Sequence, residues 1–370
     1  MRNARFSCTS LTKQAFVCIS LFAASGLTLS EETETPPWDV SAPSYSAEVQ
    51  EIDLNVTEGT WMNLDVSPDG QHIAFDLLGD IYHIPITGGE ATPLLSGHAW
   101  EVQPQYSPDG RFLAFTSDRN GADNIWVMDL ANPDDKHQIT HESFRLLNNP
   151  SWHPSGDYLV AKKHFTTSRS LGTGEVWLYD ANVDQALARG NLQGSVLVKR
   201  PSPAFQKELG EPTFSADGES VFYIQNMTPG NTFIYHEDSN GEVMAIKRYD
   251  LETGEIEKVV GGAGGAVRPT PSPDGKTLAF VKRVRAASRL FVMDLASGEQ
   301  TMLVDDLDPD MQETWAVQGA YPTMAWTPDG KSIVYWSQGH IWRVDVGSGE
   351  TRQIPFSVND TRTAYPAVAV

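Results

Sequence analysis

The sequence predicts an all-β fold, and two observations support the prediction. Helical periodicity is weak throughout the 370 residues. An apolar strand, a tight turn and a second strand recur six times, with the turns at residues 68–70, 108–110, 154–156, 216–218, 273–275 and 328–330. Successive turns are 40, 46, 62, 57 and 55 residues apart. This period is typical of units that stack or pack radially because none buries its apolar face alone.

Each repeat contains a turn of the form Pro-Asp-Gly or a close relative of it. Proline presets φ at the second turn position, and glycine supplies the positive φ that closes the hairpin. The aspartate between them, such as Asp109, is able to accept hydrogen bonds from nearby backbone donors. We therefore interpret these acids as structural turn residues and not as members of a site.

The second repeat shows the expected unit, with four strands near residues 102–106, 111–116, 124–130 and 137–140. The third strand of most units pairs an apolar residue with an aromatic one, at Ile81-Tyr82, Ile125-Trp126, Val176-Trp177, Leu290-Phe291 and Ile341-Trp342. Because the pair recurs at the same phase, we interpret it as packing between sheets and not as a ligand platform. The prediction is a six-bladed β-propeller of four-stranded antiparallel blades over residues 51–356.

Two stretches depart from the repeat. The chain is irregular between Tyr179 and Gly210, and residues 225–243 resemble an inserted hairpin. Long connections usually lie on one face and take part in recognition.

The first thirty residues have the pattern of a secretory signal peptide. A basic region that ends at Lys13 precedes a short apolar run at residues 15–24, and small residues follow. Residues 31–50 are acidic and rich in proline, which is typical of a solvated leader. Cys8 and Cys18, the two cysteines of the chain, both lie in the signal. We therefore expect a periplasmic or secreted protein without disulfides and without membrane insertion after cleavage.

The net charge of −21 argues against some partners. Residues 1–30 hold three basic residues and no acid, so the rest of the chain carries 24 basic against 48 acidic residues, a net −24. Such a surface repels phosphate backbones and anionic lipid, so we expect no nucleic-acid binding.

We find no catalytic, cofactor-binding or metal-binding residues in the sequence. A Gly-x-Ser-x-Gly elbow is absent. His137 and His141 are four residues apart but flank a strand end and do not lie on a helix, so we interpret them as surface or hydrogen-bonding histidines. The acidic run 305–310 lacks the Gly and Glu of an EF-hand, although calcium or sugar binding by this run and by residues 225–243 stays an alternative. We interpret the basic residues of 282–289 as the solvent-exposed face of a strand.

The turns resemble the WD40-like (PD40) β-propeller repeats of TolB-type proteins, whose signature is Ser-Pro-Asp-Gly followed by an apolar strand. Residues 67–75, 107–115 and 272–280 match this signature, and the resemblance covers residues 61–356. Many exported propellers share the turn, including those that precede prolyl-oligopeptidase domains. The resemblance therefore implies an architecture and no activity.

Residues 58–70, 144–150 and 310–315 more narrowly resemble the N-terminal region of large exported amidohydrolase-family proteins. Those relatives place TolB-like repeats ahead of a metal-dependent hydrolase domain, which has no counterpart here. The resemblance implies a truncated or split member of that group.

Residues 364–370, at the end of the chain, are similar in sequence to residues 320–326, which begin the sixth unit. Residues 357–370 would then begin a further repeat or form a tail that is dangling or paired at a sheet edge. Ile52, Leu54 and Val56 alternate ahead of the first unit, and we expect them to pair with this tail in closing the ring.

The sequence favours an exported, non-catalytic propeller that binds protein or peptide through a channel mouth or loop face and flanks or gates a hydrolase domain. The alternative is one part of a metal-dependent hydrolase (amidohydrolase) or peptidase whose catalytic domain is missing here. The ligand, the oligomeric state and the closure of the ring are left open.

Overall fold

Short runs of Val, Ile, Phe, Tyr and Trp form the strands, because these residues suit a pleated, half-buried surface. The computed structural model describes residues 40, 49–168, 171–238 and 240–364. In this part of the chain, it contains 27 strands and one short helix, α1 (Val183–Arg189), capped by Asn182 and Gly190. No helix of these residues is long and apolar enough to cross a membrane. The prediction of an all-β fold is confirmed.

The strands of the first half form three four-stranded antiparallel sheets, which we call sheets I to III. Sheet I contains β2 (Leu64–Val66), β3 (His72–Leu77), β4 (Asp80–Pro85) and β6 (Thr92–Leu95). Sheet II contains β7 (Glu101–Tyr106), β8 (Phe112–Ser117), β9 (Asn124–Asp129) and β10 (Asn132–Gln138). Sheet III contains β11 (Leu147–Trp152), β12 (Tyr158–Thr166), β13 (Gly172–Asp180) and β14 (Ser195–Val198).

Three further sheets of the same kind, sheets IV to VI, follow in the second half. Sheet IV contains β15 (Leu209–Phe214), β16 (Ser220–Asn226), β17 (Met244–Asp250) and β18 (Ile256–Val260). Sheet V contains β19 (Val267–Pro271), β20 (Thr277–Val284), β21 (Ala287–Asp294) and β22 (Gln300–Val304). Sheet VI contains β23 (Ala325–Trp326), β24 (Ser332–Ser337), β25 (His340–Asp345) and β26 (Thr351–Ile354). The prediction of four-stranded antiparallel units is confirmed.

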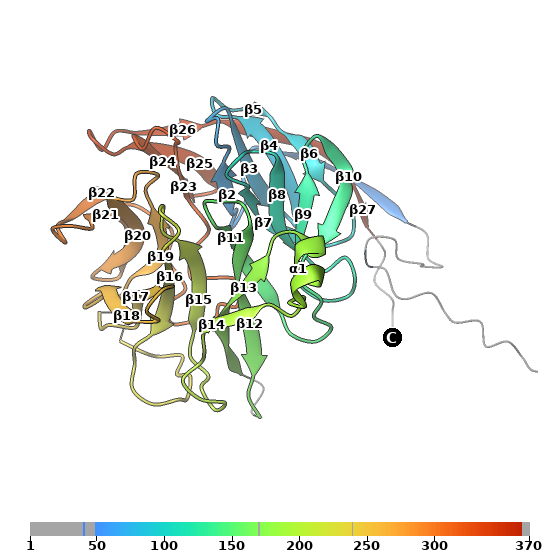
Figure 1. The fold of residues 1–370 in the computed structure, drawn as a ribbon. Helices are drawn as coiled ribbons and strands as arrows, with labels where there is room; N and C mark the ends of the chain where they lie inside the picture. Colours follow the sequence, from blue (N-terminus) through green and yellow to red (C-terminus); the bar gives the residue numbers. More distant parts are fainter. Residues whose placement is uncertain (1–39, 41–48, 169–170, 239, 365–370) are drawn as a thin grey trace, which may run out of the picture. The chain divides into compact units, whose positions relative to one another are not determined.

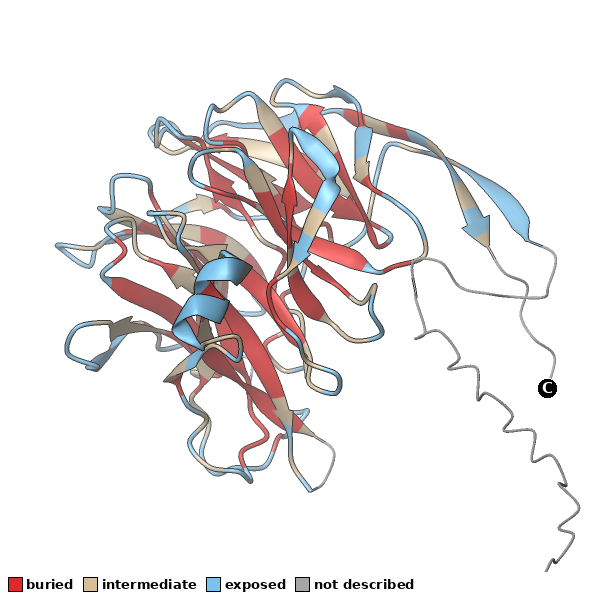
Figure 2. Ribbon diagram, turned by 45° about the vertical axis from the view of Figure 1, so that its right-hand side comes forward, coloured by how far each residue is buried: buried red, intermediate tan, exposed pale blue. Residues whose placement is uncertain are grey.

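The sheets are arranged as in a propeller. The first strand of each sheet lies near a common centre, and the later strands follow outward (Figure 1). Buried residues concentrate in the strands, whereas connections and outer strands are more exposed (Figure 2). Apolar side chains fill the space between successive sheets, as Leu113 and Met128 of sheet II do against Ile81 of sheet I. Each sheet thereby buries faces that it could not bury alone.

The turns between the first and second strands repeat one hydrogen-bond pattern. Ser67 Oγ donates to Asp69 Oδ1 at 2.5 Å and accepts from His72 N at 2.9 Å, and Gln71 N donates to Asp69 Oδ1 at 2.9 Å. The bond from Ser67 lowers the pKa of the Asp69 carboxyl. The pattern recurs at Ser107, Ser215, Ser272 and Thr327. These aspartates hold the turns, as their sequence pattern predicts.

A seventh, three-stranded sheet joins the two ends of the described chain. β1 (Gln50–Val56) pairs antiparallel with β27 (Phe356–Ala364), which also pairs parallel with β5 (Gly89–Glu90). The predicted pairing of Ile52, Leu54 and Val56 with the tail is thus confirmed up to Ala364, but the pair forms a separate sheet and does not complete a four-stranded one. Residues 365–370 lie outside the described residues, so the start of a further repeat there stays a prediction.

Polar side chains fix β27 against sheet I. Arg362 Nη2 lies 2.7 Å from Asp80 Oδ2, and the Tyr82 hydroxyl donates to Asp360 Oδ2 at 2.9 Å. Asp80 is fully buried, so the arginine supplies a counter-charge that the carboxylate would otherwise lack. The N-terminal strand β1 is in turn held by its pairing with β27.

Two stretches differ from their predictions. The stretch between Tyr179 and Gly210 is not irregular throughout, since it contains α1 and β14. The predicted hairpin at residues 225–243 is wrong, since residues 227–238 and 240–243 contain no strand and form an irregular connection between β16 and β17. Lys207 stabilises this connection by donating from Nζ to the carbonyl oxygens of Thr228 and Pro229, at 3.1 and 2.8 Å. Pro229 and Gly230 favour a turn but do not specify that strands flank it.

We predict that Gly110→Ala lowers the free energy of unfolding by about 1–2 kcal/mol, because Gly110 has φ of +71° and an L-residue is strained there. No atom outside the turn lies closer than 3.6 Å to the added Cβ, so the loss reflects backbone strain alone. The measurement is urea unfolding at equilibrium. Gly347→Ala is the control, since Gly347 is exposed and outside the positive-φ region. Equal stabilities for the two variants would contradict the prediction.

Candidate functional site

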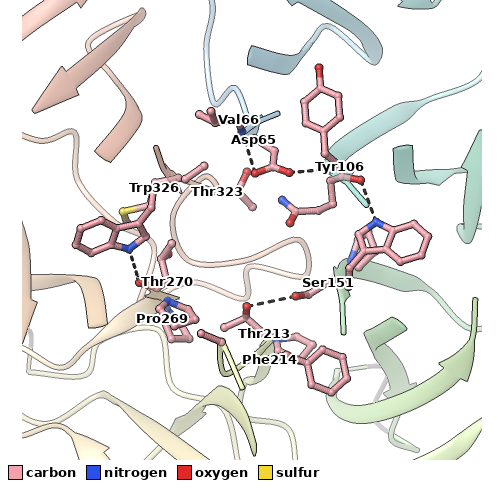
Figure 3. A pocket seen from close by; sticks show the side chains of 18 of the residues that line it. Asp65, Val66, Tyr106, Ser151, Thr213, Phe214, Pro269, Thr270, Thr323 and Trp326 are labelled. Carbon is pink, nitrogen blue, oxygen red and sulfur yellow. Dashed lines mark hydrogen bonds between the residues drawn. The ribbon is translucent and has the colours of Figure 1, made fainter. Parts of the chain in front are cut away.

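A pocket of about 370 Å³ opens where the first strands of the sheets end and the Pro-Asp-Gly turns begin. We call it the mouth pocket. All six four-stranded sheets contribute to its lining (Figure 3). Each sheet or its approach contributes one polar side chain at an equivalent place near the turns, namely Asp65, Gln105, Ser151, Thr213, Thr270 and Thr323. A site that six sheets build together is positioned by the fold as a whole.

These polar side chains alternate with bulky ones along the first strands, because successive residues of a strand point to opposite faces. The bulky residue packs toward the preceding sheet: Trp152 Nε1 donates to Gln105 O at 3.1 Å, and Trp326 Nε1 donates to Thr270 O at 2.9 Å. The polar residue faces the next sheet. Asp65 Oδ2, for example, accepts from Tyr106 N at 2.7 Å (Figure 3).

The inner end of the pocket is lined by four residues in equivalent positions, Gln103, Asn149, Glu211 and Arg268, which we call the polar floor. Each is buried, precedes a proline and has a φ between +49° and +59°. Each also lies at a β-bulge, where the register between the first and second strands of its sheet shifts. A bulge of this kind re-aims a side chain, and here it directs polar groups inward at the cost of backbone strain.

The polar floor links neighbouring sheets by bonds from side chain to backbone. Gln103 N donates to Asp76 Oδ2 at 2.8 Å, and Asn149 N donates to Gln103 Oε1 at 2.8 Å. Arg268 N likewise donates to Glu211 Oε2 at 2.6 Å. In each case, a side-chain oxygen of one sheet accepts a hydrogen bond from a backbone N–H of the next sheet. Buried polar groups of this kind stabilise only when they are paired.

The connection between β22 and β23 backs the polar floor, and we call its residues 312–321 the channel segment. Gln318 O accepts from Gln103 Nε2 at 2.8 Å and from Asn149 Nδ2 at 3.2 Å. On the opposite side, Ala320 N donates to Glu211 Oε1 at 2.6 Å and Arg268 Nε donates to Tyr321 O at 2.7 Å. The segment therefore crosses between sheets II, III, IV and V and closes this end of the channel.

Two features keep the channel segment close to the floor. Gly319 has φ of +116°, and a Cβ there would lie 2.2 Å from Arg268 Nη2, so only glycine fits. Arg283 anchors the start of the segment through ion pairs with Asp310 and Glu313. Arg283 is buried, so its predicted place on a solvent-exposed strand face is wrong. Its acidic partners lie far along the chain, beyond the reach of a local pattern.

The charges of the mouth pocket come from three residues, Asp65, Glu211 and Arg268. Glu211 and Arg268 form a buried ion pair with 3.3 Å between Oε1 and Nη2. Burial raises the pKa of Asp65 to about 7, although backbone N–H bonds from Tyr106 and Val66 act in the opposite direction. No sequence pattern marks Asp65 as a site residue, because it occupies an ordinary strand position before a turn.

The acidic run 305–310 does not converge on one point. Asp306 and Asp308 accept hydrogen bonds from Gln338, whereas Asp310 pairs with Arg283. His137 Nε2 lies 2.9 Å from Asp135 Oδ1. Within the described residues, no three His, Cys, Asp or Glu side chains are grouped so as to hold a metal ion.

A second cavity, of about 590 Å³, lies beside sheets II and III. Phe112, Val127, Trp152 and residues of α1 line it, together with His137 and His141. It is larger than the mouth pocket, but only two of the sheets and the exposed helix form it. We place the candidate site in the mouth pocket, where the first strands of all six sheets fix the side chains.

Residues 48–195 match the family model of the TolB beta propeller domain. Among curated proteins, the chain is 24% identical to a dipeptidyl aminopeptidase BIII of Pseudoxanthomonas mexicana over 61% of this chain and 36% of that protein. It is also 24% identical to tricorn protease homolog 1 of Streptomyces coelicolor over 82% of this chain and 26% of that protein. The chain thus spans about a quarter to a third of the length of these relatives.

Among solved structures, TolB from Acinetobacter baumannii superposes with a TM-score of 0.57. The superposition covers 82% of this chain and 66% of that one at 16% sequence identity. At this identity, the likeness concerns the fold.

We predict that Glu211→Gln lowers the free energy of unfolding by about 3–5 kcal/mol, because it leaves the buried Arg268 guanidinium without its counter-charge. Glu257→Gln, which breaks an exposed pair with Arg248, should cost about 1 kcal/mol or less. Both values follow from equilibrium unfolding in urea. A Glu211→Gln variant as stable as Glu257→Gln would contradict the role given to the polar floor.

We predict that Asp65→Asn weakens the dependence of stability on pH. The pKa of Asp65 in the folded state, about 7, exceeds its unfolded value. Its contribution to stability is therefore complete below the unfolded pKa and is lost as the pH rises through about 7. The decrease in unfolding free energy from about pH 5 to about pH 8 should be smaller in Asp65→Asn than in the wild type. Asp305→Asn, whose carboxylate is largely exposed, should keep the wild-type slope.

Proposed function

Because this chain contains a TolB-type β-propeller domain, we propose that it is an exported, non-catalytic binding module. Its ligand would be an extended segment of a protein or peptide held in the mouth pocket. The observation that supports this best is a preformed pocket to which all six four-stranded sheets contribute. Binding sites are typically concave, largely preformed and positioned by rigid elements.

The lining suits a peptide in chemistry and in size. Ser151 and Thr213 are bonded to each other at 3.2 Å and keep one hydroxyl proton between them, whereas Thr270 donates to Arg268 O and keeps its lone pairs. Together with the amide of Gln105, they offer donors and acceptors to a peptide backbone. Trp152 and Trp326 add aromatic surface beside them. A volume of about 370 Å³ falls at the lower end of the range for ligand pockets, so it would hold a few residues and not a folded partner.

We further infer that the six sheets are the blades of one closed ring. Hydrogen bonds between the first strands of successive sheets support this inference. The last joint, between sheets VI and I, is made by Thr323, whose Oγ1 accepts from Leu64 N at 2.8 Å and donates to Leu64 O at 2.9 Å. A closed ring would leave the first strands as short edges that are protected around a central channel.

Export and domain order complete the proposal. Residues 1–30 would be a signal peptide and residues 31–50 a solvated leader, and the propeller would lie in the periplasm or outside the cell. Residues 1–39 lie outside the described residues.

A second candidate function is supported by the coverage of the relatives. The chain matches only 36% and 26% of two peptidases. The chain would then be the propeller part of a larger peptidase or amidohydrolase and would gate substrates for a domain that is absent here. Hydrolysis of peptides by the purified chain alone, with or without added divalent metal, would contradict the non-catalytic proposal.

We predict that Ser151→Trp reduces the affinity for peptides at least about tenfold, because an indole at this position would fill much of the pocket. The measurement is calorimetric titration with short peptides that have a free N-terminus and no charged side chains. Ser297→Trp places the same side chain in an exposed turn between β21 and β22 and should bind as the wild type does. Absence of binding to the wild type, or equal binding to both variants, would contradict the mouth pocket as the peptide site.

A further inference from the structure

The mouth pocket has one charge without a counter-charge. Arg268 and Glu211 neutralise each other, and Arg268 also donates to Tyr321 O. The carboxylate of Asp65 has no such partner: in the described residues, it accepts only the backbone N–H groups of Val66 and Tyr106, at 2.9 and 2.7 Å. The Asp65 carboxyl is therefore the one ionisable group of the pocket without a partner of opposite charge, and its pKa of about 7 leaves it partly ionised at neutral pH.

The Asp65 carboxylate retains the capacity to bind a donor. Its two oxygens together offer about four lone-pair sites, and each oxygen accepts one N–H bond. Asp65 is partly exposed and lines the pocket, as Figure 3 shows, so a ligand in the pocket would lie next to its carboxylate. Gln105 follows in the next sheet with a side-chain amide, and Thr323 lies on the other side with its hydroxyl. A positively charged donor with several protons would suit this surrounding.

The closed end of the channel restricts which part of a ligand reaches Asp65. The polar floor is bonded to the channel segment across sheets II to V, so a chain would not thread through. A pocket of about 370 Å³ that is backed by the channel segment accepts a chain end or a single side chain more readily than the middle of a strand. The net charge of −21 adds a long-range attraction for cations.

We propose that the mouth pocket binds the N-terminal ammonium group of a peptide and that Asp65 is the residue that holds it. This inference rests on the proposed peptide binding and names the group that is recognised. The ammonium donates to the free lone pairs of the Asp65 carboxylate, a charge-assisted bond stronger than one between neutral groups. The first residues of the peptide then lie along the hydroxyls of Ser151, Thr213 and Thr270.

Other ligand groups fit less well. A carboxylate or phosphate would meet Asp65 without a free cation, since Arg268 is already paired. A lysine side chain carries the same ammonium, so the experiment must separate the two sources. The channel segment behind the floor favours the chain end, because a lysine within a longer peptide would require both flanking chains to turn back toward the mouth of the pocket.

The test compares three peptides of equal length by calorimetric titration of the whole chain. They are tetra-alanine amide with a free N-terminus, the same peptide N-acetylated, and an N-acetylated version with lysine at the second position. We expect acetylation to weaken binding by about tenfold to a hundredfold, as for loss of a hydrogen bond to a charged group. The lysine peptide should bind as weakly as the acetylated one.

Two variants test whether Asp65 causes the preference for a free N-terminus. Asp65→Asn should lose the preference for the free N-terminus, whereas Asp305→Asn, with the same change in net charge at an exposed position, should keep it. Because Asp65→Asn also removes an acceptor of a backbone N–H, Gln105→Lys serves as a second variant. It retains Asp65 but adds a cation to the pocket, and it too should abolish the preference for the free N-terminus.

The outcomes separate this inference from the proposed function. Equal affinity for the free and acetylated peptides, with Ser151→Trp still abolishing both, would overturn ammonium recognition and leave peptide binding intact. Restored affinity in the lysine peptide would overturn the assignment to the N-terminus. Absence of binding by all three peptides would overturn peptide binding itself.

Discussion

The structure depends on the hydrogen bonds that join the first strand of each sheet to the first strand of the next. No four-stranded sheet of this chain buries both faces alone, so each needs its neighbours in register. Side chains such as Gln103 and Glu211 set that register by accepting the backbone N–H of the following sheet. These bonds are buried, and a buried polar group without a partner would cost more than its bond contributes.

The same bonds determine the shape and the charge of the candidate site. The left-handed residues before proline turn their side chains inward, where they meet the channel segment and close one end of the channel. The pocket that is left between the floor and the turns is walled by hydroxyls and aromatic rings. The net charge of the pocket depends on which of its charged side chains form ion pairs. Arg268 is paired with Glu211, whereas Asp65 is not paired with any basic side chain of the described residues.

The parts of the fold that were predictable are those with local causes. The Ser-Pro-Asp-Gly turns were recognisable because proline, aspartate and glycine act within a few residues of one another. The pairing of Ile52 and its neighbours with the tail was expected from alternation, but its separate sheet was not. The position of that sheet is fixed in part by the ion pair of Arg362 with Asp80, residues more than 280 positions apart in the chain. The candidate site was not found for the same reason, since its lining comes from six separate first strands.

The sequence by itself determined the type of unit, its repetition and the turn chemistry, because each follows from periodicity and short-range hydrogen bonding. Only the tertiary structure decided which polar residues are buried and with what partner. Arg283 has the sequence pattern of a solvent-exposed strand residue, yet it is buried against Asp310 and Glu313. Asp65 has the pattern of an ordinary residue before a turn, yet it faces the pocket. Burial and pairing depend on contacts between distant segments, and no local pattern specifies those.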